Sequence, residues 1–454
     1  MKRIIEAIAV STLILGLVLS SAAVALAQSE PWAGKTFPAG KMTIYGYGQP
    51  QYLMEYYNAW LERNRDIAPQ VTFEMVQTAS EADARQKVIT TFASGAWNEL
   101  PTLVQTAPVS MYAMAEAGIL VDLTDYLAPL ENQLVPGALD EMKYKGRIYG
   151  LPDSVRPQLL FYNVEIFEKY GIDPDEMDTI EGWIEVGRKL KELSGGTVYL
   201  SYIDPGANAW RYYGRRGFMP QANARIWDDQ GNVVIDTDPG ARLAFKTIET
   251  LVNEGLVLKS AIFQPPLYEA TRNGQIATFY IGAFWDEFLR GNLPDMAGKW
   301  RVRPAPMYAE IGLRGAPVSQ MHVIIDKPSN VYKDLALKLW TDFHFDAENR
   351  RIWVESMERQ NAPYANPITK SLLEDPFWKE PSAYYGGQSF REMEALGLQN
   401  GARNLRVTPD DAEADQIISA ELEKFIAGAQ TMDEAIANMG RNLRSRIGKT
   451  VPAE

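Results

Sequence analysis

The chain has 454 residues, more than one hydrophobic core usually serves, and with 46% hydrophobic and 23% charged residues it is typical of a globular protein. Its formal net charge of −13 makes nucleic acid and anionic membrane surfaces poor partners. The absence of cysteine excludes disulfides, thiolate metal sites and cysteine nucleophiles, and two histidines leave little for a Ser-His-Asp triad or a multi-histidine metal site. We therefore expect two lobes, no metal and no cofactor.

The N-terminal segment has the pattern of a secretory signal peptide. Lys2 and Arg3 precede an uncharged stretch over residues 7–27, which ends in the small-x-small sequence Ala25-Leu26-Ala27. Left uncleaved, an apolar stretch of this length could anchor the chain in a bilayer. Because the stretch is rich in Ala and Ser and ends in small residues, we predict a signal peptide over residues 1–27, cleaved after Ala27, and a periplasmic mature protein.

Strands and helices alternate after this leader. The hydrophobic pattern predicts strands over 42–45, 71–76 and 102–104 and helices over 52–65 and 79–93. A βαβ start of this kind favours a parallel sheet. The first part of the chain is therefore predicted to form an α/β lobe.

A second alternating region follows residues 150–153. No Gly/Ser-rich linker separates the two regions, which indicates a hinge made of strands. The pattern of the second region predicts strands over 158–162, 276–281 and 318–325 and helices over 180–193, 238–254 and 331–343. The last third is predicted to be mainly helical, with helices over 412–427 and 432–447.

Several short segments stand out by their sequence: Ala117–Thr124, Tyr149–Pro152, Leu160–Asn163, Phe167–Ile172, Asn273–Ala277, Gly282–Trp285 and Ile426–Ala435. In this order and spacing, over about residues 40–450, they resemble the sugar-type extracellular solute-binding proteins (family 1), the periplasmic receptors of ABC importers. The chain departs from the family pattern at Pro101–Gln105 and at Gly315-Ala316, so the resemblance implies no particular sugar.

The resemblance implies an α/β fold of the two-lobed periplasmic binding protein type, with hinge strands between the lobes and a helical C-terminal third. The first lobe would hold residues 40–155 and 314–362, and the second residues 156–313 and 363–454. The implied protein is a monomeric receptor without catalytic residues. It captures a carbohydrate, in our interpretation an oligosaccharide, by hinge closure and delivers it to the membrane permease of an ABC importer.

A sugar-binding cleft needs aromatic rings for the C–H faces of the sugar and polar side chains for its hydroxyls. Tyr47 and Gln49 follow the first predicted strand and Gln105 ends the third, at the edge where open α/β sheets bind ligands. The alternative for Tyr47 and Gln49 is a surface turn. Arg156 stands at the hinge, where it could reach the cleft or form an interlobe salt bridge.

Further candidates lie in the predicted second lobe. Trp285 stands where the resembling family has a ligand-stacking aromatic, and the alternative is a core tryptophan. Tyr384 and Tyr385 lie in a polar loop where relatives also offer an aromatic, unless they only pack the loop. Trp210 could form the floor of the lobe or pack a helix. Asp286 could accept hydrogen bonds from two sugar hydroxyls or be solvated.

Arg211, Arg215 and Arg216 form a basic cluster in an acidic chain. In an α-helix, Arg211 and Arg215 would share one face. Such a cluster suits an acidic cargo, such as a uronate-containing sugar or a glycerol phosphate ester, and its alternative is a solvated helix face paired with acids. A secreted glycosidase or lyase is a third hypothesis, which needs two carboxylates at a defined separation, but no Asp or Glu stands in a recognisable catalytic motif.

Overall fold

The computed structural model describes residues 30–47, 51–135, 137–328, 330–360 and 366–450. The predicted signal peptide and the candidate Gln49 lie outside these residues. In the ranges described, none of the helices combines the length and the apolar character that crossing a bilayer requires.

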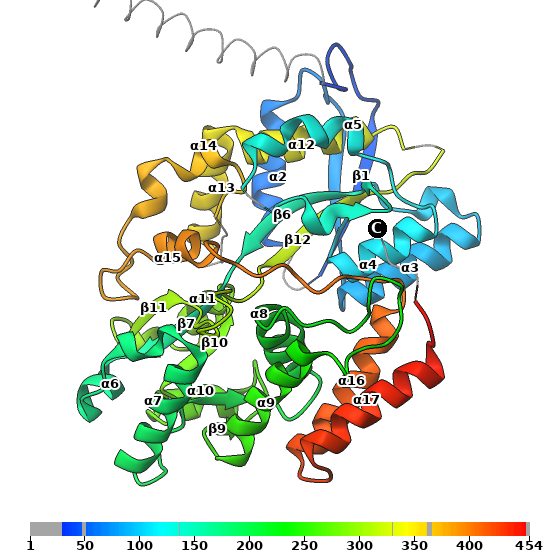
Figure 1. Cartoon of the computed structure of the whole chain (residues 1–454). Coiled ribbons are helices and arrows are strands. Elements are labelled where there is room, and N and C mark those ends of the chain that lie inside the picture. The colour runs from blue at the N-terminus through cyan, green and yellow to red at the C-terminus, as the bar shows by residue number, and fades with distance from the viewer. Residues whose placement is uncertain (1–29, 48–50, 136, 329, 361–365, 451–454) are drawn as a thin grey trace, which may run out of the picture.

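One half of the molecule, the upper part of Figure 1, is built on a five-stranded sheet. The strand order is β2 (Val71–Thr78), β1 (Gly40–Tyr47), β3 (Leu103–Thr106), β12 (Val318–Ile324) and β6 (Gly150–Arg156). β1 is parallel to β2 and β3, as predicted, whereas β12 is antiparallel to β3 and to β6. We call the part of the chain that packs around this sheet the first lobe.

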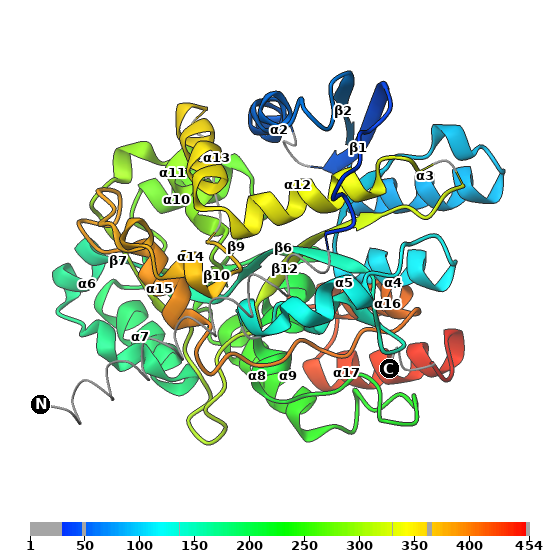
Figure 2. The ribbon, with the colours of Figure 1, turned by 90° about the horizontal axis from the view of Figure 1, so that it is seen from above.

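Helices flank this sheet (Figure 2). They are α2 (Tyr52–Arg63), α3 (Glu81–Ala93), α4 (Pro108–Glu116), α5 (Thr124–Leu127), α12 (Lys333–Phe345), α13 (Ala347–Arg359) and α14 (Lys370–Leu373), and β4 (Lys143–Tyr144) forms a short hairpin with β5 (Arg147–Ile148). Local signals set where they begin: the Ser80 hydroxyl accepts a 3.1 Å hydrogen bond from the backbone N–H of Asp83 at the start of α3, and α4 begins with Pro108.

The lower half of Figure 1 is built on a three-stranded antiparallel sheet in the order β10 (Thr278–Gly282), β7 (Gln158–Asn163) and β11 (Trp300–Pro304). The parallel pair β8 (Ser201–Ile203) and β9 (Val257–Lys259) adjoins it, because the N–H of Thr278 donates to the carbonyl of Leu200 at 2.8 Å. We call the part of the chain around these strands the second lobe.

The second lobe contains more helix than strand. Its helices are α6 (Val164–Tyr170), α7 (Ile180–Leu193), α8 (Met219–Gln221), α9 (Pro239–Asn253), α10 (Pro265–Arg272), α11 (Trp285–Asn292), α15 (Phe390–Gly397), α16 (Asp411–Ile426), α17 (Met432–Arg446) and the π-helix η5 (Ala209–Phe218). α17 begins with a capping box in which the hydroxyl of Thr431 accepts from the N–H of Glu434 and the Glu434 carboxylate accepts from the N–H of Thr431.

Two separate clusters of buried apolar side chains correspond to the two lobes. The first includes Ile44, Val104 and Met321 from the five-stranded sheet, and the second includes Phe161 and Phe279 from the three-stranded sheet. Each lobe therefore has its own core, as independently folded domains do. The predicted α/β class with two lobes and a mainly helical C-terminal third is confirmed.

The chain passes between the lobes where β6 ends at Arg156 and β7 begins at Gln158, and it re-enters the first sheet at β12. Ile368, Trp378 and Val407 also belong to the first cluster, and in Figure 1 the segment between α15 and α16 runs back across the middle of the molecule. The expected lobe limits near residues 156 and 314 stay predictions, and the limit at 362/363 falls outside the described residues.

Candidate functional site

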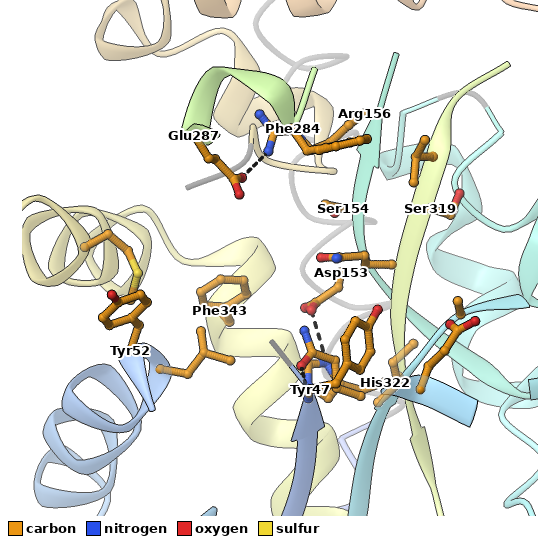
Figure 3. A pocket seen from close by; sticks show the side chains of 18 of the residues that line it. Tyr47, Tyr52, Asp153, Ser154, Arg156, Phe284, Glu287, Ser319, His322 and Phe343 are labelled. Carbon is orange, nitrogen blue, oxygen red and sulfur yellow. Dashed lines mark hydrogen bonds and ion pairs between the residues drawn. The ribbon is translucent and has the colours of Figure 1, made fainter. Parts of the chain in front are cut away.

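A cavity of about 900 Å³ lies between the two lobes. The first lobe contributes the ends of β1, β3, β6 and β12 and the helices α2, α12 and α13, and the second lobe contributes η5, α11 and the segment before α10. Its lining includes Tyr47, Tyr52, Tyr57, Glu81, Gln105, Asp153, Ser154, Arg156, Arg211, Tyr212, Arg216, Phe263, Phe284, Glu287, Phe288, Ser319, His322, Trp340, Phe343, Arg350 and Trp353. Figure 3 shows part of this lining.

Tyr47 and Gln105 meet at the cavity because β1 and β3 are neighbouring parallel strands. Both residues line it, and the backbone N–H of Tyr47 donates to the side-chain oxygen of Gln105 at 3.4 Å. Burial raises the pKa of the Tyr47 hydroxyl well above its usual value, so the group stays protonated and can donate a hydrogen bond. The sheet edge chosen from the sequence is thus an edge of the cavity.

Aromatic rings line the second-lobe side of the cavity. Phe263 lies 4.5 Å from Phe288 between ring centroids, and Phe284 lies 5.8 Å from Tyr212. Phe263 has a φ of +62°, a left-handed conformation that is unfavourable for a bulky side chain. Such backbone strain concentrates at binding sites. Across the cavity, Tyr52 and Phe343 of the first lobe present further rings (Figure 3).

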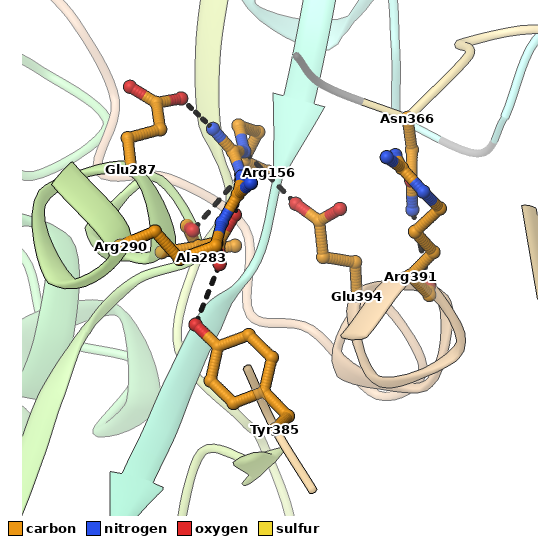
Figure 4. Close-up of polar contacts among 9 residues, drawn as sticks. Arg156, Ala283, Glu287, Arg290, Asn366, Tyr385, Arg391 and Glu394 are labelled. Atoms are coloured by element: carbon orange, nitrogen blue, oxygen red, sulfur yellow. Dashed lines mark hydrogen bonds and ion pairs between the residues drawn. The ribbon is translucent and has the colours of Figure 1, made fainter. Parts of the chain in front are cut away.

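Arg156 lines the cavity at the point where β6 leaves the first lobe. Its Nε donates to a Glu394 carboxylate oxygen at 3.0 Å, its Nη2 donates to the Ala283 carbonyl at 3.0 Å, and its Nη1 pairs with Glu287 (Figure 4). Burial disfavours the charged guanidinium, but the carboxylates of Glu394 and Glu287 outweigh it and raise the pKa of Arg156. Arg156 therefore does both things that its position at the hinge suggests: it lines the cleft, and it forms ion pairs with helices of the second lobe.

Both histidines of the chain lie beside Asp153, a lining residue of β6. His322 Nδ1 is 3.3 Å from one carboxylate oxygen of Asp153, and His344 Nε2 is 3.6 Å from the other. Burial opposes ionisation of Asp153, but the two imidazoles lower its pKa overall. Burial lowers the pKa of His344 to about 4, partly opposed by Asp153 and assisted by the charge of Arg350. Sequence reasoning missed this group because two histidines far apart in the chain carry no spacing signal.

Residues 46–339 match the family of bacterial extracellular solute-binding proteins. The chain belongs to this family. The arabinooligosaccharide-binding protein of Halalkalibacterium halodurans is 23% identical over 277 residues, which are 56% of this chain and 60% of that protein. The lactose-binding protein of Rhizobium radiobacter is 25% identical over 282 residues, 61% of this chain and 63% of that protein. The chain thus spans about three fifths of the length of these relatives.

Solved structures share the fold of this solute-binding protein. The ABC transporter associated binding protein of B. animalis subsp. lactis Bl-04, in complex with beta-1,6-galactobiose, has a TM-score of 0.71 and 20% identity, and the match covers 91% of this chain and 99% of that chain. The substrate-binding protein of Listeria monocytogenes in complex with cycloalternan has the same TM-score of 0.71 and 20% identity, covering 91% and 100%. The family resemblance inferred from the sequence is confirmed.

The structure of the solute-binding protein does not bring Trp285 to the cavity. Its ring is fully buried in the second core, with centroid distances of 5.0 Å to Phe279 and 5.6 Å to Phe288. The cavity face of α11 and the residue before it consists instead of Phe284, Glu287, Phe288, Gly291 and Asn292. This spacing of three and four residues is one helix face, and Trp285 lies on the other.

Asp286, Tyr384 and Tyr385 hold α11 from behind and are not among the lining residues. The Asp286 carboxylate accepts a 2.7 Å hydrogen bond from the Tyr385 hydroxyl and pairs with Arg290 at 2.6 Å. The Tyr384 hydroxyl donates to the carbonyls of Leu289 and Leu293 at 3.1 and 2.9 Å, at the end of the helix. These contacts fix the helix that presents Phe284 and Phe288.

Trp210 and Arg215 also point away from the cavity. Trp210 Nε1 donates to Asp415 at 2.7 Å, and Arg215 pairs with Asp415 at 2.7 Å and with Asp411. Arg211 and Arg216 line the cavity instead. The prediction that Arg211 and Arg215 share one face is wrong, because it assumes α-helical spacing and η5 is a π-helix with i→i+5 hydrogen bonds.

Proposed function

We propose that this protein is a receptor that encloses a carbohydrate between its two lobes and delivers it to the permease of an ABC importer. The observation that carries the proposal is the interlobe cavity, in which aromatic rings of both lobes and the polar groups of Tyr47, Gln105 and Ser319 surround one space. Flat rings suit the C–H faces of a sugar, and the polar groups suit its hydroxyls.

The size of the cavity and the relatives support an oligosaccharide as cargo. About 900 Å³ is near the upper end of the range for small-molecule sites. Two relatives are named as arabinooligosaccharide-binding and lactose-binding proteins, and one structure of the same fold holds beta-1,6-galactobiose. Each of these ligands has more than one sugar unit.

Binding without turnover distinguishes this receptor from a secreted glycosidase. Three carboxylates line the cavity: Glu81, Asp153 and Glu287. Glu287 pairs with Arg156 and Asp153 lies beside both histidines (Figure 3), which leaves Glu81 as the lining carboxylate without such a partner in the described part of the chain. A glycosidase needs two carboxylates that are free to act on the bond. The family to which the chain belongs is one of binding proteins.

Cargo capture would occur outside the cytoplasm, after removal of the predicted signal peptide, and the receptor would act as a monomer. Closure of the lobes around a sugar gives the permease a surface that differs between loaded and empty receptor. Size-exclusion chromatography with light scattering on the mature protein, residues 28–454, tests whether it is a monomer in solution.

A thermal-shift screen of the mature protein against arabino-, galacto-, gluco- and xylo-oligosaccharides tests the receptor. A ligand that binds only the native state raises the melting temperature by mass action. We expect a rise with at least one oligosaccharide, one-to-one stoichiometry in titration calorimetry, and recovery of the sugar intact. Release of shorter sugars by the pure protein would contradict the receptor and favour a glycosidase.

A further inference from the structure

Arg211 and Arg216 are the cavity-lining arginines without an ion pair or hydrogen bond to any residue that the structure describes. The other arginine of the same helix, Arg215, is held by Asp411 and Asp415, and Arg156 is held by Glu287 and Glu394. Arg216 is half-buried, and Arg211 is exposed although it lines the cavity. Their donors are available to a ligand.

The π-helix η5 presents both guanidiniums to the same side. Their central carbons lie 5.9 Å (Arg211) and 5.8 Å (Arg216) from the centroid of the Tyr212 ring, which also lines the cavity. A guanidinium over an aromatic ring keeps its N–H donors free for other partners. Both arginines can therefore offer their donors to a group in the cavity.

Two carboxylates act on this pair from the first lobe without forming an ion pair with it in the described part of the chain. Glu81 lines the cavity, and Glu141 lies behind the lining next to Ser319. Burial raises the pKa of Glu141 to about 7, so it carries only part of a negative charge at neutral pH. Burial and the neighbouring charge of Arg211 lower the pKa of Arg216, opposed by Tyr212, Glu81 and Glu141.

We propose that the cargo carries an anionic group, the carboxylate of a uronate or a sulfate or phosphate ester on a sugar, which binds between Arg211 and Arg216. This inference rests on the proposed receptor function and specifies its substrate class. Two arginines match the two oxygens of a carboxylate or of an ester anion with charge-assisted hydrogen bonds. The rings of Tyr212, Phe284 and Phe288 remain available for the sugar face.

Matched pairs of ligands test the proposal by titration calorimetry on the mature protein. The probes are trigalacturonate, glucuronate-bearing xylotriose and trimannuronate, each with its carboxyl-reduced counterpart, together with sulfated and phosphorylated galactobiose. We expect one anionic probe to bind at least tenfold more tightly than its neutral counterpart, with an affinity that falls as salt rises. The ester probes then distinguish a carboxylate from a sulfate or phosphate as the bound group.

Variants connect this preference to the arginine pair. Arg211→Gln and Arg216→Gln should each lower the affinity for the anionic probe about 10- to 100-fold, the usual loss with one charge-assisted contact. Glu81→Gln removes a competing negative charge and should strengthen that binding. Arg188→Gln is the matched control, because Arg188 pairs with Glu254 on the exposed surface of the second lobe. A variant whose melting temperature equals that of the wild-type protein is taken to be folded.

The outcomes separate this inference from the receptor function. Tight binding of a neutral oligosaccharide that exceeds binding of every anionic probe, unchanged in both arginine variants, would overturn the anionic cargo and keep the receptor. No binding of any saccharide would overturn both. If Arg216→Gln fails to fold, two measurements still test the anionic cargo. They are the salt dependence of binding to the wild-type protein and the affinity of the Arg211→Gln variant, and neither needs Arg216 to be replaced.

Discussion

Phe284 and Trp285 are neighbours in sequence whose side chains serve opposite sides of α11. Phe284 lines the cavity, whereas Trp285 is 0% exposed in the core of the second lobe. Phe284→Ala should weaken oligosaccharide binding by about 1–3 kcal/mol with little change in melting temperature. Titration calorimetry and thermal unfolding of the same preparation measure both effects.

Trp285→Ala is the matched control for that experiment. Removing a fully buried tryptophan leaves a cavity and should lower the free energy of unfolding by about 3–5 kcal/mol. A Trp285→Ala variant that unfolds normally but no longer binds sugar would contradict the assignment of the two faces and restore Trp285 as a ligand contact.

The sequence predicts that the segment of α11 lies at the site, but it does not predict which face of the helix points into the cavity. The sequence predicts Trp285, Asp286, Tyr384 and Tyr385 as ligand contacts, whereas in the structure they support the helix and do not line the cavity. The pattern in the sequence does not distinguish the faces, because both carry large aromatic residues. In contrast, Tyr47 and Gln105 do line the cavity, as their positions at strand ends predict, since the parallel sheet brings these ends together.

His344 is a buried titratable group whose pKa is lowered to about 4 from an ordinary value of 6.5, chiefly by burial. Between these two values the unfolded chain binds a proton that the native protein does not. Stability is therefore complete above pH 6.5 and falls as the pH drops toward 4, by on the order of 3 kcal/mol from this group.

A His344→Gln variant isolates that contribution. Carboxylates also affect acid stability, so the measured quantity is the difference between wild type and variant in denaturant unfolding at pH 7 and at pH 5. We expect the variant to lose less stability than the wild type on acidification. Parallel loss in the two proteins would mean that His344 takes up its proton at the same pH in the native and the unfolded protein, so that burial does not lower its pKa.

At the scale of elements, Arg156 connects the hinge strand β6 to two helices of the second lobe, α11 and α15 (Figure 4). Its partner Glu394 is only 2% exposed. Arg156→Ala would leave this carboxylate buried without its cation, which typically costs about 3–5 kcal/mol. We expect a corresponding fall in the denaturant midpoint, with partial recovery in Arg156→Lys. Arg188→Ala, which breaks an exposed pair, should change stability by about 0–1 kcal/mol.

Most elements of the first lobe follow from hydrophobic periodicity. The strand predicted over 71–76 is β2 and the helix predicted over 79–93 is α3, each within two residues at either end. The π-helix η5 could not be predicted, because the choice of i→i+5 over i→i+4 hydrogen bonds depends on packing that a short sequence window does not contain. Its consequence is specific: it turns Arg216 instead of Arg215 toward the cavity.

At the scale of the whole molecule, two separate cores with a cavity between them allow the lobes to move as rigid bodies. The lobes should close only when a ligand contacts both, because neither wall alone supplies the contacts that favour the closed state. Small-angle X-ray scattering should therefore record a smaller radius of gyration when a saturating oligosaccharide is added.

The Phe284→Ala variant provides a demanding control for closure. At a ligand concentration that saturates the wild type but not the variant, the scattering curve of the variant should be a mixture of open and closed forms, and more ligand should complete the change. This concentration dependence follows because a ligand shifts an equilibrium only by its difference in affinity for the two states. An unchanged radius of gyration in the saturated wild type would mean that the sugar binds to one lobe alone, and the permease would then have to recognise the loaded receptor without a change in the relative position of the lobes.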